Sequence, residues 1–417
     1  MKKLFITLCF LLLISNVCIA ATPNFDVYCN SAILIDARTG NVLYEKNSNK
    51  QAYPASTTKI LTAYIALSQK QDMNTEIIPS RNSVMSVPAG SSIAYFSENE
   101  KLTLEQVLFG LLLPSGNDAA NILAEHISGS NANFAELMNV TAEKLGATNS
   151  HFTNPSGLHD NEHYTTAADL AKIAYNVMKI PKFKEIVSQS RYIMPKTNVS
   201  KTDRTFINTN KLLVSGEYYY ESATGIKTGY TSQAGNCLVS SASKDGVELI
   251  AVVLGGHTIP VGKSAVYTDT INLFNFGFKN YHNNQLVAPS NVITTVIPKK
   301  SGKQTLELIT DSPINVLVEN GDTPTFEKII SLNEKIVAPI KKGDVLGTLT
   351  YTKNGEIAGI VNLVAKTDIE KEHWVWVSLK ILISFVVSVI ILGVFLRLFN
   401  DIKKNMRKRR RNKIMRW

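Results

Sequence analysis

Runs of apolar residues with the two-residue period of β-strands occur in two separate parts of the chain. Residues 32–37 and 42–45 form such runs on either side of a turn at Arg38-Thr39-Gly40-Asn41, which predicts a β-hairpin. Three later runs are joined by glycine-containing turns and cover residues 225–230, 236–242 and 247–255. We expect strands from both parts to share one antiparallel sheet.

Between these strands the apolar residues repeat every three to four positions, which is the period of an amphipathic helix. This pattern covers residues 56–69. Thr103 and Gln106 have the capping-box spacing that opens a helix, and Pro114 ends it. Further helices are predicted from Asp118 to near Gly129, over residues 165–178 with a stop at Pro181, and over residues 264–278. A helical middle between two groups of strands indicates an α+β domain over residues 21–284.

The rest of the chain has a different pattern. Residues 285–366 contain short alternating runs and turns such as Glu319-Asn320-Gly321, which predict a small all-β domain. Residues 374–396 are almost entirely apolar, and their only charge is Lys380 near the start. At 1.5 Å per residue this segment reaches about 34 Å, which is long enough for a transmembrane helix.

The N-terminus has the layout of a secretory signal peptide. Lys2 and Lys3 precede an apolar run over residues 4–14, and small residues follow around Ala20. We expect cleavage after Ala20, which would remove residues 1–20. The apolar run is too short to cross a bilayer comfortably, so a permanent anchor at this end is not expected.

The net charge of +10 is concentrated at the two ends of the chain. Residues 397–417 contain ten basic residues and Asp401, while Lys2 and Lys3 add two further positive charges, so residues 4–396 are close to neutral. A basic domain that binds nucleic acid is therefore not expected. The positive-inside rule places the basic tail, residues 397–417, in the cytoplasm and the body of the protein on the outer face of the membrane.

Two of the four cysteines, Cys9 and Cys18, lie in the predicted signal peptide, which leaves Cys29 and Cys237 in the exported part. Two cysteines alone do not decide whether a disulfide forms. They are also too few for a cysteine-rich metal site.

Ser56 and Lys59 stand three residues apart at the start of the helix predicted over residues 56–69. Residues at this spacing share one helix face, with Cβ atoms about 5–6 Å apart, so the amine can accept the hydroxyl proton. The positive helix end and partial burial both lower the pKa of such a lysine. A helix-capping serine before a solvated lysine has the same spacing, and so do Ser241 and Lys244, so the pattern alone is not specific.

Two further motifs carry side chains suited to substrate binding. Ser115 and Asn117 lie in the short loop after Pro114, where one can relay a proton and the other can bind an amide. Lys227-Thr228-Gly229 lies on a predicted strand, where a lysine and a threonine can hold a carboxylate and a glycine lets a peptide approach closely. Each motif is weak alone, because turn chemistry and an ordinary edge strand give the same residues.

In this order, Ser56 to Lys59, Ser115 to Asn117 and Lys227 to Gly229 resemble the motifs of the penicillin-recognising serine hydrolases. The surrounding residues 53–60, 113–120, 154–158 and 225–231 are similar to those of the low-molecular-mass D-alanyl-D-alanine carboxypeptidases. This resemblance implies a catalytic domain of the β-lactamase and transpeptidase type, with an antiparallel sheet and a helical cluster. It also implies a β-rich second domain and a membrane anchor.

The resemblance assigns a role to each motif in the cleavage of a peptide bond between two terminal D-alanines. Ser56 is expected to attack the bond, Lys59 to accept its proton, and Ser115 to relay that proton to the leaving amine. Asn117 is expected to hold the substrate amide. Water then releases the acyl-enzyme, and no metal or other cofactor is implied.

The same resemblance assigns the substrate carboxylate to Lys227 and Thr228, while Gly229 allows close approach of the peptide. The backbone N–H groups of Ser56 and Tyr230 are expected to form the oxyanion hole. The implied partners are peptidoglycan pentapeptide stems, β-lactam antibiotics and the membrane, which the C-terminal helix would cross.

Two departures from the family pattern limit these expectations. Some relatives have an arginine after the Gly255-Gly256 pair that assists the carboxylate, whereas this chain has His257. Many relatives lie on the membrane through an amphipathic helix, whereas this chain is expected to span it.

Three alternative functions remain open from the sequence. A β-lactamase has the same fold, but such enzymes are usually single soluble domains with a glutamate-bearing loop before the Lys-Thr-Gly strand. A zinc peptidase is suggested by His159 and His163 in the pattern H-x-x-E-H, although the flanking residues predict a loop rather than the required helix. A catalytically silent cell-wall scaffold is the third alternative.

Overall fold

The computed structural model describes residues 24–372 and 374–414, so the predicted signal peptide lies outside the described residues. The described chain divides into two compact units between Asn283 and Asn284, and the short segment Leu317–Thr323 belongs to the first. The first unit combines a sheet with the helices α1 to α8. The second consists of strands and ends in the long helix α9 (Trp374–Ile414).

A five-stranded antiparallel sheet forms the centre of the first unit. Its strands, in sheet order, are β2 (Val42–Lys46), β1 (Ser31–Asp36), β9 (Val247–Gly256), β8 (Gly235–Lys244) and β7 (Ala223–Thr231). The N-terminal hairpin joins the later strands through the pairing of β1 with β9. This confirms the prediction of one sheet built from both parts of the chain, and it leaves β7 at an edge.

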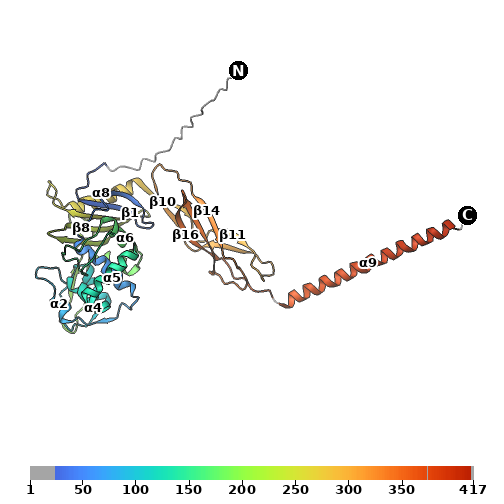
Figure 1. The fold of residues 1–417 in the computed structure, drawn as a ribbon, viewed down its shortest axis with the longest axis horizontal. Helices are drawn as coiled ribbons and strands as arrows, with labels where there is room; N and C mark the ends of the chain where they lie inside the picture. Colours follow the sequence, from blue (N-terminus) through green and yellow to red (C-terminus); the bar gives the residue numbers. More distant parts are fainter. Residues whose placement is uncertain (1–23, 373, 415–417) are drawn as a thin grey trace, which may run out of the picture. The chain divides into compact units, whose positions relative to one another are not determined.

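Alternate residues of the central strands enter two different hydrophobic cores. Ile33 and Ile35 of β1 pack in one core, whereas Ala32 and Leu34 pack in the other. Because successive side chains of a strand point to opposite faces, a strand buried on both faces is continuously apolar. The helix α8 (Ala265–Asn280) covers one face, and α6 (Ala167–Val177) with the rest of the helical cluster covers the other (Figure 1).

The helical cluster contains most of the helices expected from the sequence. Thr103 and Gln106 exchange both hydrogen bonds of a capping box at the start of α3, as predicted. The helices of the cluster besides α6 are α1 (Lys59–Ser68), α2 (Arg81–Met85), α3 (Leu104–Leu112), α4 (Asn117–Ser128), α5 (Asn131–Lys144) and α7 (Pro181–Val187). Two short sheets complete the unit, β3 (Glu76–Ile77) with β4 (Leu102–Thr103), and β5 (Arg191–Met194) with β6 (Arg204–Ile207).

Two predictions about these helices were incomplete, and one helix was not predicted. The helix expected to begin at Ser56 begins as a 3₁₀ turn over Ala55–Thr58, and the α-helix follows from Lys59. The helix α5 was not predicted, because its apolar residues are few. Pro181 does not only stop a helix but also opens α7 at its first position, where its missing N–H costs nothing.

The second unit is a β domain, as the alternating runs predicted. Its main sheet has the order β11 (Val292–Val296), β12 (Leu306–Thr310), β16 (Glu356–Ala365), β15 (Val345–Lys353) and β14 (Glu327–Leu332). The strands β10 (Tyr281–Val287) and β13 (Ile314–Glu319) pair in a separate two-stranded sheet, and residues 281–283 and 317–319 of these strands belong to the first unit. Residues of β12 and β13 alternate between buried and less buried positions, as expected for strands with one covered face.

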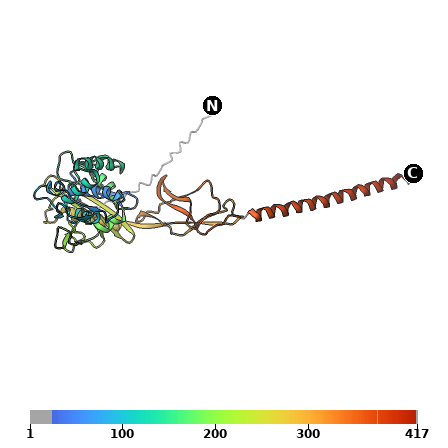
Figure 2. The ribbon, with the colours of Figure 1, turned by 90° about the horizontal axis from the view of Figure 1, so that it is seen from below.

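The helix α9 is longer than the apolar segment expected over residues 374–396. It continues without a break through the basic residues to Ile414 (Figure 2). Lysine, arginine and methionine favour helices, and no proline follows the apolar part to end it. Residues Val377–Arg409 are long and apolar enough to cross a membrane. Lys380 Nζ reaches Glu372 Oε1 at 2.5 Å, so its charge points toward the start of the helix.

Candidate active site

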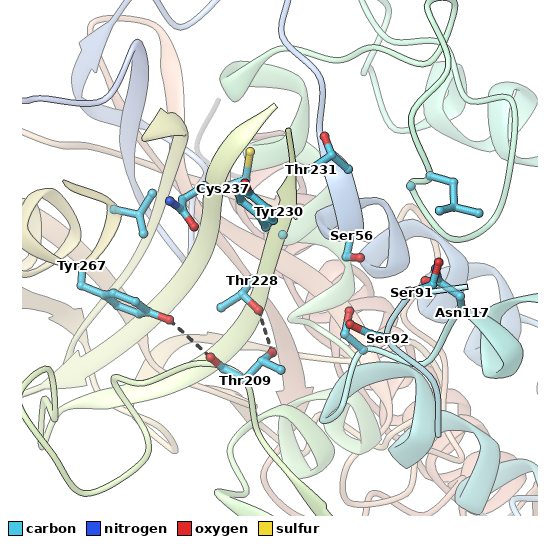
Figure 3. Close-up of a pocket in the computed structure, with 17 residues that line it drawn as sticks. Ser56, Ser91, Ser92, Asn117, Thr209, Thr228, Tyr230, Thr231, Cys237 and Tyr267 are labelled. Atoms are coloured by element: carbon cyan, nitrogen blue, oxygen red, sulfur yellow. Dashed lines mark hydrogen bonds between the residues drawn. The ribbon is translucent and has the colours of Figure 1, made fainter. Parts of the chain in front are cut away.

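A cleft of about 490 Å³ lies where the edge strand β7 meets the helical cluster (Figure 3). It contains Ser56, Ser115, Asn117 and the strand segment from Thr228 to Thr231, so it brings together residues from all three sequence motifs. The resemblance to the family implied this convergence. The cleft also includes residues that the sequence analysis did not single out, among them Ser91, Ser92, Thr209, Asn236, Cys237 and Tyr267.

The 3₁₀ turn places Ser56 and Lys59 closer together than an α-helix would. In a 3₁₀ helix the side chains at positions i and i+3 lie directly above one another. Lys59 Nζ consequently lies 3.0 Å from Ser56 Oγ. The turn follows Pro54, and Ala55 has a φ of 48°, an uncommon value for a residue with a side chain.

Lys59 is fully buried, with 0% of its surface exposed. Its Nζ donates to Asn117 Oδ1 at 2.6 Å and to the Ser156 carbonyl oxygen at 2.7 Å. Burial lowers the pKa of Lys59 well below its usual 10.5, and the nearby charge of Lys227 lowers this pKa further, while Asp118 opposes the change. These causes favour an uncharged amine.

The hydrogen bonds of Lys59 fit that uncharged form. A neutral amine has two N–H donors and one lone pair, and carbonyl oxygens can only accept hydrogen bonds. If Asn117 and Ser156 take the two N–H groups, the lone pair is left for the hydroxyl of Ser56. The arrangement therefore allows Lys59 to accept the proton of Ser56.

The loop between α3 and α4 brings Ser115 and Asn117 to the cleft. Ser115 has a φ of 66°, a left-handed conformation that a serine rarely adopts. Asn117 begins α4, and because its Oδ1 accepts from Lys59, its Nδ2 is the group that it can offer to a substrate carbonyl.

Asp118 fixes another wall of the cleft. Its buried carboxylate accepts hydrogen bonds from the backbone N–H groups of Ala94 at 2.8 Å and Phe96 at 3.1 Å. The loop that it holds supplies Ser91 and Ser92 to the cleft. Burial raises the pKa of Asp118, and these hydrogen bonds partly offset the rise. An aspartate in a helix's first turn is common, so the position of Asp118 in the sequence does not indicate this contact.

On the other side of the cleft, β7 lies against the turn that holds Ser56. A Cβ atom added to Gly229 would be 2.9 Å from the Ser56 backbone nitrogen, so only glycine allows this close approach. Lys227 is buried, and burial lowers its pKa to about 7. Its Nζ donates to the Thr228 carbonyl oxygen at 3.1 Å.

Thr209 is a cleft residue that sequence reasoning missed. Thr228 Oγ1 donates to Thr209 Oγ1 at 2.6 Å, and the Tyr267 hydroxyl donates to the Thr209 carbonyl oxygen at 3.3 Å (Figure 3). Lys227 Nζ lies 3.5 Å from the same threonine hydroxyl. A threonine in a loop far from any recognised motif carries no signal for this contact in the sequence.

His257 is not brought to the cleft with the others. Its side chain is exposed, and it is not among the described residues that surround the cleft. Cys29 and Cys237 are both buried and free, which answers the question of a disulfide that the sequence left open. Burial raises the pKa of Cys237 to about 11, so its thiol stays protonated at neutral pH.

The segment His159–His163 is a loop, as its flanking residues predicted. His163 is buried, and its Nε2 lies 2.9 Å from Thr58 Oγ1. Among the described residues, no group of three or more histidine, cysteine, aspartate or glutamate side chains is placed to hold a metal ion.

Comparison with known proteins identifies the family. Residues 17–258, more than half of the chain, match the family model described as D-alanyl-D-alanine carboxypeptidase, peptidase family S11. The D-alanyl-D-alanine carboxypeptidase DacF of Bacillus subtilis is 35% identical over 352 residues, which cover 83% of this chain and 87% of the relative. The chain belongs to the D-alanyl-D-alanine carboxypeptidase family.

The second unit and the fold agree with this family. Residues 281–371 match the model of the C-terminal domain of penicillin-binding protein 5. Penicillin-binding protein 5 of Haemophilus influenzae is 28% identical, with a TM-score of 0.61, over 84% of this chain and all of that structure. The fold of penicillin-binding protein 3 of Streptococcus pneumoniae is also similar, with a TM-score of 0.72 at 23% identity over 83% of this chain and all of that structure. The expected fold class, a transpeptidase-like domain followed by a β domain, is thus confirmed.

Proposed function

We propose that this member of the carboxypeptidase family removes the terminal D-alanine from peptidoglycan pentapeptide stems through an acyl-enzyme on Ser56. The observation that carries the proposal is the position of Lys59, whose buried Nζ lies 3.0 Å from Ser56 Oγ while two carbonyl oxygens accept its N–H groups. The names of the relatives support the same substrate class.

In the first half of the reaction, Ser56 Oγ attacks the carbonyl carbon of the penultimate D-alanine as Lys59 accepts the hydroxyl proton. The backbone N–H groups of Ser56 and Tyr230 stabilise the oxyanion of the tetrahedral intermediate. The carbon–nitrogen bond then breaks, and the proton passes from Lys59 through Ser115 to the leaving amine. The products are D-alanine and an ester on Ser56.

In the second half, a water molecule attacks the ester carbonyl and gives its proton to Lys59. The bond to Ser56 Oγ breaks, and this oxygen recovers the proton as the shortened peptide leaves. During both halves Asn117 holds the substrate amide, whereas Lys227 and Thr228 hold the terminal carboxylate only until the D-alanine leaves at the end of the first half. β-Lactam antibiotics would acylate the same serine, because they present a reactive amide carbonyl to it.

We further propose the domain scheme expected from the sequence. Residues 1–20 are a signal peptide, residues 21–284 the catalytic domain and residues 285–366 the β-rich domain. Residues 374–396 cross the membrane, and residues 397–417 remain in the cytoplasm, with the body on the outer face. An Asn412→Cys variant in whole cells should react with a membrane-impermeant maleimide only after permeabilisation, because the tail would lie in the cytoplasm. Cys29 and Cys237 are buried and should add little background labelling. Labelling of intact cells would place the tail outside.

The direct test of the activity is D-alanine release by the purified full chain from a peptide ending in D-Ala-D-Ala. Ser56→Ala should fold and release none. Ser241→Ala is the matched control, because Ser241 and Lys244 repeat the same spacing on β8, away from the cleft. D-Alanine release by Ser56→Ala would contradict the assignment. Rapid turnover of benzylpenicillin without D-alanine release would indicate a β-lactamase, and no reaction with either compound would indicate a silent scaffold.

A further inference from the structure

His163 is buried beside the 3₁₀ turn Ala55–Thr58, called the catalytic turn below, but the proposed reaction does not use this histidine. Only 2% of its surface is exposed, and it lies on the loop that joins α5 to α6. Its ring packs edge-on against Phe152 at a centroid distance of 5.5 Å. The two ring nitrogens contact two different segments of the active site.

The hydrogen bonds of His163 fix its tautomer. The backbone N–H of Thr153 donates to Nδ1 at 3.1 Å, so Nδ1 carries a lone pair and no proton. In the neutral ring the proton is then on Nε2, which donates to Thr58 Oγ1 at 2.9 Å. Burial lowers the pKa of His163 to about 4, which keeps the ring neutral at physiological pH.

His163 joins two segments of the chain. One leads directly into Lys59, and the other carries the Ser156 carbonyl oxygen that accepts a hydrogen bond from Lys59 Nζ. Thr58 is the residue before Lys59 in the catalytic turn. Thr153 precedes the tight turn 154–158, in which Asn154 Oδ1 accepts hydrogen bonds from the backbone N–H groups of Gly157 at 2.8 Å and Leu158 at 3.1 Å. That turn presents the Ser156 carbonyl oxygen to Lys59 Nζ at 2.7 Å.

The same two segments are packed too tightly for a side chain between them. A Cβ atom on Gly157 would lie 1.9 Å from the Ala55 carbonyl oxygen and 2.9 Å from Thr58 Oγ1. Thr62 Oγ1 adds a hydrogen bond to the Pro155 carbonyl oxygen at 2.7 Å. A small movement of this turn would therefore alter the contact of Ser156 with Lys59.

We propose that His163 is a positioning residue, which ties Thr58 to the turn 154–158 and so holds the Ser156 carbonyl oxygen against Lys59 Nζ. This inference rests on the proposed role of Lys59 as the base. With the carbonyl in place, one N–H of the amine is occupied and its lone pair is directed at Ser56. Without the tether, the turn loosens, water enters and the amine is no longer kept dry or oriented.

The test compares variants of the full chain by the rate of acylation with benzylpenicillin across a pH series. His163→Ala should acylate about tenfold to a hundredfold more slowly at pH 7, and the rising limb of its pH profile should move about one unit to higher pH, because a less buried lysine keeps its proton longer. His163→Gln, whose amide can still donate to Thr58, should recover most of the rate. Thr58→Val removes the acceptor, so its effect should not add to that of His163→Ala.

His151→Ala is the matched control for a purely structural role. His151 lies on the same loop, and its described contacts are with the Glu162 carbonyl oxygen, 2.6 Å from its Nδ1, and with the ring and backbone of Tyr164 rather than with the turn Ala55–Thr58. This variant should lower the melting temperature and leave the pH profile unchanged. An unshifted profile in His163→Ala would overturn the proposal, and so would an equal shift in His151→Ala.

A second measurement separates this inference from the proposed function. The titration midpoint of Lys59, followed by NMR of the 13C-labelled lysine side chains, requires no turnover. It should rise by about one unit in His163→Ala and stay constant in His151→Ala. A wild-type chain that never acylates would refute the proposed function, whereas an unchanged Lys59 midpoint in His163→Ala would refute the role of His163 alone.

Discussion

The two units of the chain differ in where they keep charged side chains. In the first unit, Lys59, Lys227 and Asp118 are buried around the cleft. Among the described residues of the second unit, the buried polar side chains are the hydroxyls of Ser301, Thr310 and Thr352. Burying a charge costs several kcal/mol unless hydrogen bonds or other charges compensate it.

This difference indicates which unit does the chemistry. The buried lysines of the first unit have lowered pKa values because water is excluded from them, and that exclusion is what makes an amine a usable base. The second unit requires only alternating strands with one covered face. Substitutions of the buried charged residues around the cleft should therefore change reaction rates, while substitutions in the second unit should change stability alone.

The largest effect is expected from removing the base. Lys59→Met should lower the acylation rate by about a thousandfold or more, because general base catalysis typically contributes a factor of 10² to 10⁴ and a buried partner is lost as well. Lys59→Arg should be equally inactive, because a guanidinium keeps its proton. Stopped-flow acylation by a chromogenic β-lactam measures both. Substantial activity in Lys59→Arg would show that acylation requires a positive charge at position 59 rather than a proton acceptor.

The pH dependence of the KM should report the charge of Lys227. Lys227 must be charged to hold a carboxylate, and burial places its pKa at about 7, so binding is complete below that pH and is lost as the pH rises through it. The KM for a D-Ala-D-Ala peptide should therefore rise about tenfold for each pH unit above 7. Lys227→Arg is the control, because its charge persists and its KM should stay flat. A wild-type KM that is constant up to pH 9 would contradict the lowered pKa.

A moderate effect is expected at Asp118. Asp118→Asn replaces one carboxylate oxygen with an N–H donor that faces the backbone N–H groups of Ala94 and Phe96. The free energy of unfolding should fall by about 1–3 kcal/mol, and D-alanine release should slow by about tenfold as the loop with Ser91 and Ser92 loosens. Urea unfolding and turnover measure the two effects. Asp160 is exposed and supplies the control, since Asp160→Asn should change neither the free energy of unfolding nor the rate. A normal rate in Asp118→Asn would show that the loop with Ser91 and Ser92 does not contribute to catalysis.

The smallest effect on activity is expected from the second unit. Leu349→Ala empties a fully buried position opposite Val361 in the main sheet and should destabilise this unit by about 2–5 kcal/mol. Limited proteolysis should cut the second unit faster, while kcat/KM for a soluble peptide stays within about twofold of wild type. A large loss of kcat/KM would mean that the stability of the second unit affects catalysis in the first. It would contradict the claim that substitutions in the second unit change stability alone.

The same contrast describes how far the sequence predicted the structure. The two-residue period found the hairpin of β1 and β2 and the β domain, and the spacing of Thr103 and Gln106 found the start of α3. These features depend on local patterns that the sequence displays directly. The convergence of Ser56, Ser115 and Lys227 came from the resemblance to a family, because residues so far apart in the chain have no local signal.

The supports of the site could not be predicted. The Ser156 carbonyl is a backbone group that every residue has, and Asp118 and Thr209 act through contacts with distant loops. The 3₁₀ turn at Ser56 also overrides the helical period, because packing of Gly157 and Gly229 against it fixes the backbone. Local patterns carry no information about such long-range contacts.

The most direct test of the account is the intact mass of the full chain after incubation with benzylpenicillin, followed by digestion to locate the adduct. The account predicts one drug molecule per chain, a long-lived ester on Ser56, normal adduct in Ser241→Ala and none in Ser56→Ala. An adduct on another residue, or an unmodified protein beside unconsumed drug, would contradict the assignment of Ser56 as the nucleophile and Lys59 as its base.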